Sequence, residues 1–218
     1  MNQTLPVIEE FVRIPSPCPP FGLACDGPHL WVGSTKTRRI YGIDSRNGKV
    51  FAEVTAPATP FGMAVTGDAL RVIVADDNDD RYLCRYVMGK DFKRTERLPL
   101  PDLAGSSLAY DGDALFVCQR YDRKIVEIDG RGRTIREIPT PKMAIGMTIV
   151  GGRIYLLASD DGDDTPFSLI RMDARGPYPE IVELAAVPFI PRALAFDGFR
   201  FWTSDKRENT IVAFAKPD

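Results

Sequence analysis

The stretch Gly22-Leu23-Ala24-Cys25-Asp26-Gly27 decides the fold, because its pattern returns four more times along the chain. Each copy places a small residue, an apolar residue and a second small residue before a turn glycine, and an apolar strand follows. The apolar residue of the pattern recurs at intervals of 39 to 47 residues. Repeats of about 40–45 residues that each hold about four strands are typical of β-propeller blades. The five copies are residues 22–27, 62–67, 107–112, 146–151 and 193–198.

The segment after the turn glycine continues the repeat. Three copies align without a gap, and each has an isoleucine thirteen residues after its glycine, at Ile40, Ile125 and Ile211. This isoleucine opens a third strand with apolar residues on both faces, as expected for a sheet that packs between neighbouring sheets. A turn such as Asn47-Gly48 leads to a fourth strand, and the fourth strands end in prolines, which suit an outer edge.

The two ends of the chain predict how the ring closes. Residues 12–17 resemble residues 136–141, which end a fourth strand, so residues 7–14 are predicted to form a fourth strand too. The last repeat has only three strands. We therefore expect an all-β, five-bladed β-propeller of four-stranded blades, a single domain over residues 1–218, in which the N-terminal strand completes the last blade.

The composition excludes several classes of partner. The net charge is −2 and the pI is near 5.6, so no basic field exists to hold nucleic acid or an anionic membrane. No apolar run approaches the roughly 18 residues of a membrane span, and the first residues lack the features of a signal peptide. These features predict a cytoplasmic protein. The four cysteines lack CxxC spacing and are predicted to be reduced, although Cys18 and Cys25 could face each other across a loop.

A ligand site is predicted at one end of the central channel. The loops that lead into the innermost strands gather there with the loops that join second strands to third strands. Arg192 stands in a leading loop where other repeats have small or apolar residues, and Gln119, Asp205 and Ser34 hold equivalent places at the ends of second strands. Arg192 could bind a carboxylate or phosphate, or it could neutralise nearby acidic loops.

Two phenylalanines belong to the same end of the channel. Phe21 and Phe61 each follow a proline and precede a glycine in a leading loop. They either pack between blades or form an aromatic wall for a ligand.

Acidic inserts lengthen two of the joining loops. Asp76 and Asp77 belong to one insert, and Asp160 and Asp161 belong to the other. Clustered oxygen donors suit Ca²⁺ or Mg²⁺, which makes a divalent cation one hypothesis. The alternative is that these are solvated turns in which Asp and Asn bond exposed backbone groups.

Common catalytic signatures are missing. The single histidine, His29, lies just after a turn glycine, at the end away from the proposed site, so a Ser-His-Asp, Cys-His or His-rich zinc centre is not expected. A carboxylate pair for acid–base chemistry remains an alternative among the four insert aspartates and Asp205. No glycine-rich phosphate loop is present.

The run from Gly22 to Val32, with residues 39–44 and 47–50 behind it, resembles the repeats of a bacterial propeller group. The group includes NHL, YVTN and SMP-30/gluconolactonase-like proteins, virginiamycin B lyase and glutaminyl cyclotransferases. The resemblance covers the whole chain and implies a propeller that is a metal-dependent lactonase, a lyase, a cyclase or an interaction module.

The chain departs from each of these families. It lacks the length and the catalytic histidine of the seven-bladed lyase and the entry-position glutamate of the six-bladed lactonases. It also has no glutamate near residues 32–34, where the cyclotransferase active site would fall. The function expected is therefore the binding of a small polar or anionic molecule at the channel mouth, with metal-assisted hydrolase or lyase activity of a lactonase-like kind left open. The alternative is a non-catalytic scaffold that binds a protein partner.

Overall fold

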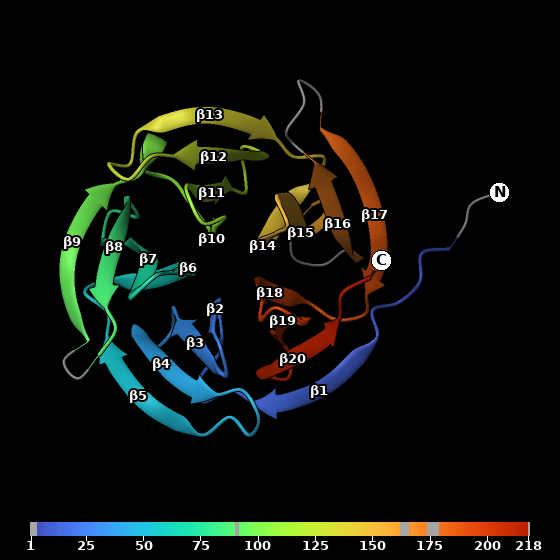
Figure 1. Ribbon diagram of the computed structural model, residues 1–218, viewed down its shortest axis with the longest axis horizontal. Coiled ribbons are helices and arrows are strands. Elements are labelled where there is room, and N and C mark those ends of the chain that lie inside the picture. Colours follow the sequence, from blue (N-terminus) through green and yellow to red (C-terminus); the bar gives the residue numbers. More distant parts are fainter. Residues whose placement is uncertain (1–3, 90–91, 162–165, 174–178, 218) are drawn as a thin grey trace.

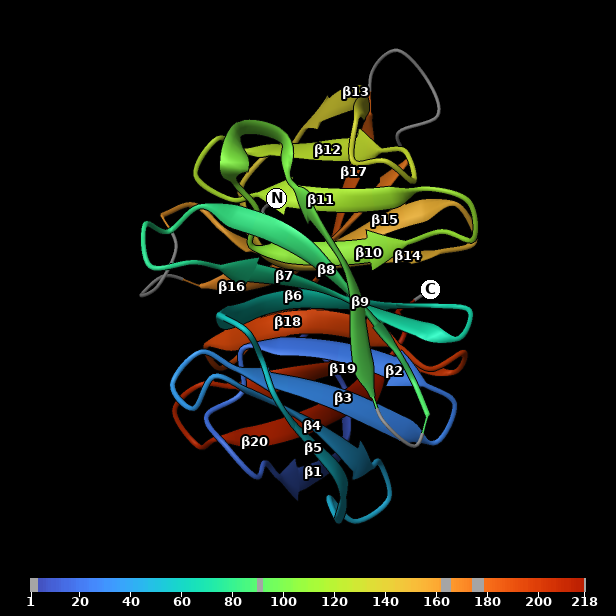
Figure 2. The same cartoon turned by 90° about the vertical axis from the view of Figure 1, so that its left-hand side faces the viewer.

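The computed structural model describes residues 4–89, 92–161, 166–173 and 179–217. These residues form five antiparallel sheets of four strands each, arranged as blades around one axis (Figure 1). The predicted five-bladed β-propeller is thus confirmed. Figure 2 shows how strongly a blade twists between its innermost and outermost strands, as in β6 and β9.

The blades follow the chain in order, with the innermost strand first. Blade 1 comprises β2 (Gly22–Asp26), β3 (His29–Ser34), β4 (Arg39–Asp44) and β5 (Val50–Thr55). Blade 2 comprises β6 (Thr59–Thr66), β7 (Ala69–Ala75), β8 (Arg81–Val87) and β9 (Lys93–Pro99). Blade 3 comprises β10 (Ser107–Tyr110), β11 (Leu115–Gln119), β12 (Lys124–Ile128) and β13 (Thr134–Pro139), and a short 3₁₀ turn, η1 (Pro101–Leu103), precedes it. Blade 4 comprises β14 (Met143–Val150), β15 (Arg153–Ser159), β16 (Phe167–Asp173) and β17 (Glu180–Val187). Blade 5 comprises β18 (Pro191–Phe196), β19 (Arg200–Asp205), β20 (Thr210–Ala215) and, on its outer edge, β1 (Glu10–Pro15).

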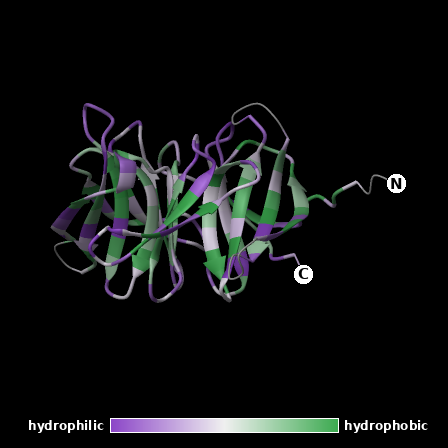
Figure 3. Ribbon diagram, turned by 90° about the horizontal axis from the view of Figure 1, so that it is seen from above, coloured by the Kyte–Doolittle hydropathy of each residue, from purple (hydrophilic) through white to green (hydrophobic). Residues whose placement is uncertain are grey.

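A hydrophobic cluster fills each interface between neighbouring blades. The cluster between blades 1 and 2, for example, joins Trp31 and Ile40 to Val72 and Tyr86. Figure 3 shows the hydrophobic colour running along the strands, while much of the hydrophilic colour lies in the connecting loops. The described part of the chain has no helix of the length and apolar character that a membrane crossing requires.

The N-terminal strand closes the ring, as predicted. β1 pairs antiparallel with β20, and Ile14 stands opposite Ile211. Ile14 is buried in the cluster between blades 5 and 1, where Leu30 and Trp202 also lie. The strand begins at Glu10 rather than at residue 7 because residues 6–8 bond to β17 of blade 4 instead. The N-terminal segment therefore connects two blades.

An arginine fixes this closing strand to the turn after β19. Nη1 of Arg13 lies 3.0 Å from Oδ2 of Asp205 and 2.8 Å from Oε2 of Glu208. The same side chain binds Glu10 through Nε at 2.8 Å. These hydrogen bonds with carboxylates raise the pKa of Arg13 above its ordinary value. The arginine stays charged and joins both ends of the chain in blade 5.

Truncation of Ile14 tests this closure. We expect Ile14→Ala to lower the free energy of unfolding by about 2–5 kcal/mol, because the change leaves a cavity between blades 5 and 1. Phe11→Ala, in the same strand at a side chain that is 56% exposed, should change it by less than about 0.5 kcal/mol. Chemical denaturation of both variants measures the difference. Equal stability of the two would contradict a closing role for β1.

Small residues at the start of the repeat let the innermost strands approach each other. A Cβ built on Gly62 would lie 2.5 Å from the Cα of Ser107 on the next inner strand. A Cβ on Gly22 would collide with the carbonyl oxygen of Phe61, and one on Gly146 with the backbone of Ala193. Backbone therefore packs against backbone around the axis, which is why the first position of the motif is small.

Gly62→Ala tests this packing. The added methyl group meets backbone atoms that cannot move aside cheaply, so we expect a loss of about 1–3 kcal/mol in unfolding free energy. Gly130→Ala is the matched control, because a Cβ at Gly130 meets nothing within 4 Å and the backbone there has an ordinary φ. Thermal and denaturant unfolding should show the control at or above wild-type stability. A Gly62 variant as stable as the control would show that the strands have room to spare.

Candidate functional site

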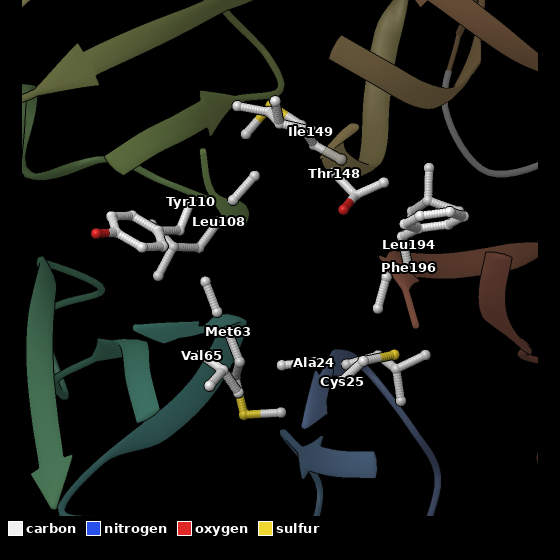
Figure 4. Close-up of a pocket in the computed structure, with 15 residues that line it drawn as sticks. Ala24, Cys25, Met63, Val65, Leu108, Tyr110, Thr148, Ile149, Leu194 and Phe196 are labelled. Carbon is white, nitrogen blue, oxygen red and sulfur yellow. The ribbon is translucent and has the colours of Figure 1, made fainter. Parts of the chain in front are cut away.

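The axis of the propeller has a small pit at the lower end, where the turn glycines lie. The pit has a volume of about 140 Å³ and is lined by the middle and last residues of the five inner strands. Most of the lining side chains are apolar (Figure 4). The hydroxyl of Thr148 points toward the opening, whereas that of Tyr110 points away and donates to the carbonyl of Gly112 at 2.6 Å. None of the predicted site residues line this pit.

A second pocket lies at the upper end, where the inner strands begin, between blades 2 and 3. Its volume is about 200 Å³. Three loops build it: the β7–β8 loop, the segment that leads into β10, and the turn after β11. The lining residues are Asp79, Arg81, Leu103, Ala104, Gly105, Ser106, Gln119, Arg120, Tyr121 and Asp122.

Gln119 is the buried polar residue of this pocket. It ends β11 and is only 2% exposed. Its Nε2 donates to the carbonyl oxygen of Pro101 at 2.9 Å, which fixes the orientation of the amide. Its Oε1 is buried and accepts no hydrogen bond from the described residues. Buried amide oxygens are normally paired, so an unpaired one in a pocket wall indicates a missing donor.

Arg81 supplies the complementary group. It begins β8, and its guanidinium lies 3.6 Å from the centre of the Phe61 ring. Nη2 donates to Oδ1 of Asp79 at 2.8 Å, and Nε donates to the carbonyl of Asp79 at 3.2 Å. Nη1 is buried and has no acceptor among the described residues. Two residues that line the pocket thus each have a buried atom without a partner among the described residues, a donor on Arg81 and an acceptor on Gln119.

The two predicted phenylalanines link this pocket to blade 5. The rings of Phe21 and Phe61 meet edge to face, with centroids 5.1 Å apart. The guanidinium of Arg192 lies 5.7 Å from the centre of the Phe21 ring. Each ring is half-buried, and Phe61 also packs against the hydrophobic cluster between blades 2 and 3. A row of cation–π and aromatic contacts therefore runs from Arg81 to Arg192.

A backbone bulge in β18 holds Arg192. The register shifts between Arg192 and Ala195, and Ala193 has a positive φ of 56°. The hydroxyls of Thr203 and Ser204 on β19 donate to the carbonyl of Arg192 at 3.1 and 3.0 Å. Arg192 is buried, with 6% of its surface exposed.

The side chains of Asp205 and Ser34 are occupied by contacts within the fold. Asp205 binds Arg13 through Oδ2, and its Oδ1 accepts the backbone N–H of Arg207 at 2.9 Å. Ser34 is fully buried, and its Oγ accepts the backbone N–H of Thr37 at 3.4 Å. The sequence had grouped both with Gln119 and Arg192 in one pocket. The pocket around Gln119 includes neither Asp205, Ser34 nor Arg192.

The two acidic inserts lie in separate blades. Their aspartates interact with nearby backbone N–H groups and basic side chains. Oδ1 of Asp76 accepts the backbone N–H groups of Asn78 and Asp80 at 3.0 and 3.2 Å. Asp77 faces Arg38 at 3.4 Å, and Asp160 lies 3.9 Å from Nζ of Lys142. Asp161 is exposed, and the residues that follow it lie outside the described ranges. Within those ranges, no three His, Cys, Asp or Glu side chains converge as a metal site would require. A divalent cation stays a prediction.

Two aspartate variants separate the hypotheses for these inserts. If the role of Asp76 is to accept backbone hydrogen bonds within its loop, Asp76→Ala should lower the unfolding free energy by about 1 kcal/mol, because two backbone donors lose their acceptor. Asp77→Ala should be neutral, because that side chain is 92% exposed. Millimolar Ca²⁺ should then leave the melting temperature of the wild-type protein unchanged. A calcium-dependent rise that Asp76→Ala or Asp160→Asn weakens would favour the metal hypothesis instead.

The cysteines do not supply a nucleophile. All four are free, as predicted, and none forms a disulfide. Burial raises the pKa of Cys118, near the pocket, to about 12, so its thiol is neutral. Burial also raises the pKa values of Cys18, Cys25 and Cys84. Because the thiolate is the reactive form, these residues are suited to packing rather than covalent chemistry.

Sequence reasoning missed several residues of the pocket. Arg81, Arg120 and Tyr121 were not singled out, although Arg81 directly follows an acidic insert and Arg120 directly follows Gln119. Their position in joining loops at the upper end was the available signal. The sequence pattern did not show that the packing of blade 2 against blade 3 brings these residues into one pocket.

Solved structures similar to this chain are β-propeller proteins. The glutaminyl cyclase of Myxococcus xanthus aligns with a TM-score of 0.73 and 10% identity, over 98% of this chain and 100% of that one. The PQQ-bound aldose sugar dehydrogenase of Streptomyces coelicolor aligns with a TM-score of 0.58 and 12% identity, over 98% and 97% of the two chains. The Cps50 (Swd1) β-propeller domain of Myceliophteria thermophila aligns with a TM-score of 0.54 and 12% identity, over 90% and 84%.

These similarities show the fold alone, because the identities are so low. No protein-family model matches the chain, and no curated protein matches it. The resemblance to propellers is therefore confirmed, while the narrower grouping with NHL and SMP-30-like proteins stays a prediction.

Proposed function

We propose that this chain is a small-molecule-binding β-propeller whose ligand occupies the pocket between blades 2 and 3. The observation that carries the proposal is the pair of unpaired buried atoms, Oε1 of Gln119 and Nη1 of Arg81. Each costs free energy in the folded state, about 1–3 kcal/mol for a buried group without a partner. A ligand that satisfies both would recover that cost on binding.

The two atoms select the chemistry of the ligand. Oε1 of Gln119 requires an N–H or O–H donor, and Nη1 of Arg81 requires an acceptor, best met by a carboxylate. Asp79 and Asp122 line the same pocket and suit a positively charged or N–H-bearing group. A small molecule that carries both a carboxylate and an amino or amide group fits this set. Amino acids and their short derivatives are the proposed ligand class.

A catalytic role is the narrower form of this proposal. Two of the structural neighbours are named as a cyclase and a dehydrogenase, so enzymes occur on similar folds. Metal-assisted hydrolase or lyase activity, of a lactonase-like kind, would need a cation among the acidic inserts, and no three His, Cys, Asp or Glu side chains converge there in the described ranges. Binding is the function that the geometry of the pocket around Gln119 supports best.

Ligand screening with one variant tests the proposal. A panel of amino acids, their amides and dipeptides should contain a compound whose binding, measured by calorimetry, weakens at least tenfold in Gln119→Leu. The variant removes an unpaired amide oxygen but also the hydrogen bond from Nε2 to the carbonyl of Pro101, so its free energy of unfolding should stay within about 1 kcal/mol of wild type. Arg38→Ala, at an exposed arginine in the corresponding turn of blade 1, is the matched control and should bind normally.

Two results would contradict the proposal. One is a panel with no binder at millimolar concentration. The other is a binder with equal affinity for wild type and Gln119→Leu, which would place its site elsewhere. A protein captured through the exposed Tyr121 and Leu103, with no small-molecule binder, would favour the scaffold alternative.

A further inference from the structure

Another pocket, outside the site described above, opens between blades 1 and 2. Its volume is about 580 Å³. It lies at the lower end of the blades, beside the turn between β2 and β3, whereas the pocket around Gln119 lies at the upper end. Its lining residues are Asp26, His29, Trp31, Phe51, Ala52, Glu53, Val54, Met88, Gly89 and Phe92.

Aromatic rings form the walls of this pocket. The ring centroids of Trp31 and Phe92 are 4.8 Å apart, and those of Trp31 and Phe51 are 5.6 Å apart. His29 lies 4.5 Å from Phe51. The rings are tilted against one another, by 74° between Trp31 and Phe51 and by 32° between Trp31 and Phe92. Four aromatic side chains, those of His29, Trp31, Phe51 and Phe92, thus stand together in the lining of the pocket.

A glycine on β4 provides the space for the Phe51 ring, and that ring is partly exposed. A Cβ on Gly42 would lie 2.7 Å from Cζ of Phe51, so the glycine allows that ring to lie over β4. Phe51 is nevertheless 51% exposed. Trp31 beneath it is 4% exposed, and its Nε1 has no acceptor among the described residues.

Two acidic side chains, Asp26 and Glu53, are among the lining residues of the pocket, and no lysine or arginine of the described part of the chain lines it. Glu53 forms an ion pair with Arg39, which does not line the pocket. The carboxylate of Asp26 makes no ion pair or hydrogen bond with the described residues. Electron-rich ring faces beside carboxylates attract a cation, and quaternary ammonium groups are recognised in this way.

We infer that the pocket between blades 1 and 2 binds a small organic cation of the alkylammonium class. The aromatic rings contact its alkyl groups, and Asp26 supplies the opposite charge. A neutral apolar ligand would gain contact with the rings but would leave Asp26 without a partner. The inference does not rest on the proposed function, because the two pockets share no residue.

Choline and its neutral isostere, 3,3-dimethylbutan-1-ol, are the probes that test this inference. The two compounds have the same shape and differ in charge. We expect choline to bind at least about tenfold more tightly, because both the cation–π contact and the attraction to Asp26 require charge. The indole N–H signals of the two tryptophans give the readout by NMR. Choline should shift that of Trp31 and leave that of Trp202, whose Nε1 donates to Asp197 at 2.7 Å in the buried core, unchanged.

Variants locate the site and separate it from the other pocket. Phe51→Leu and Asp26→Asn should each weaken choline binding about three- to fivefold, since these are surface contacts. Phe199→Leu, at an 89% exposed ring at the same end of the molecule, is the matched control and should have no effect. Gln119→Leu should leave choline binding unchanged. Equal binding of choline and the neutral isostere, unaffected binding in both pocket variants, or an unmoved Trp31 signal at millimolar choline would each overturn the inference.

Discussion

Close packing of the innermost strands around the axis is the constraint on which the rest of the structure depends. Backbone meets backbone at Gly22, Gly62 and Gly146, so the strands converge farther than side chains would allow. Five blades then fit around a narrow axis, and the axial pit keeps a volume of only about 140 Å³. A pit of this size can hold few atoms. Sites for larger ligands must therefore form away from the axis, where neighbouring blades diverge.

Both larger pockets described above obey this geometry. One lies at the upper end between blades 2 and 3, and the other lies at the lower end between blades 1 and 2. Blade 2 contributes to each of them, through Arg81 at one end and Phe92 at the other. The hydrophobic clusters between the blades hold these walls in place, because each blade is packed on two sides. Polar side chains lie at the ends of the interfaces between blades, where the strands end and the loops begin.

Ring closure uses groups that would otherwise be available for binding. Asp205 occupies a position equivalent to that of Gln119, yet Arg13 of β1 neutralises it. A buried carboxylate is costly unless it is paired, and the closing strand supplies the partner. Among the described residues no arginine pairs with Gln119, and only its amide nitrogen forms a hydrogen bond. Equivalent positions in the repeat thus have different roles because one blade is completed by the opposite end of the chain.

The sequence by itself determined the number of blades, the order of their strands and the closing role of the N-terminus. These features follow from local patterns: turn glycines, small residues at a fixed place in each repeat, and period-two apolar strands. It also identified Gln119, Phe21 and Phe61 as residues of the upper end. Only the tertiary structure decided which of the candidates share a pocket, because Arg13 and Asp205 meet across 192 residues of chain and Arg81 reaches Gln119's pocket from another blade. The aromatic pocket between blades 1 and 2 could not be predicted from the sequence either, because its rings belong to strands and loops that only the packing of the blades brings together.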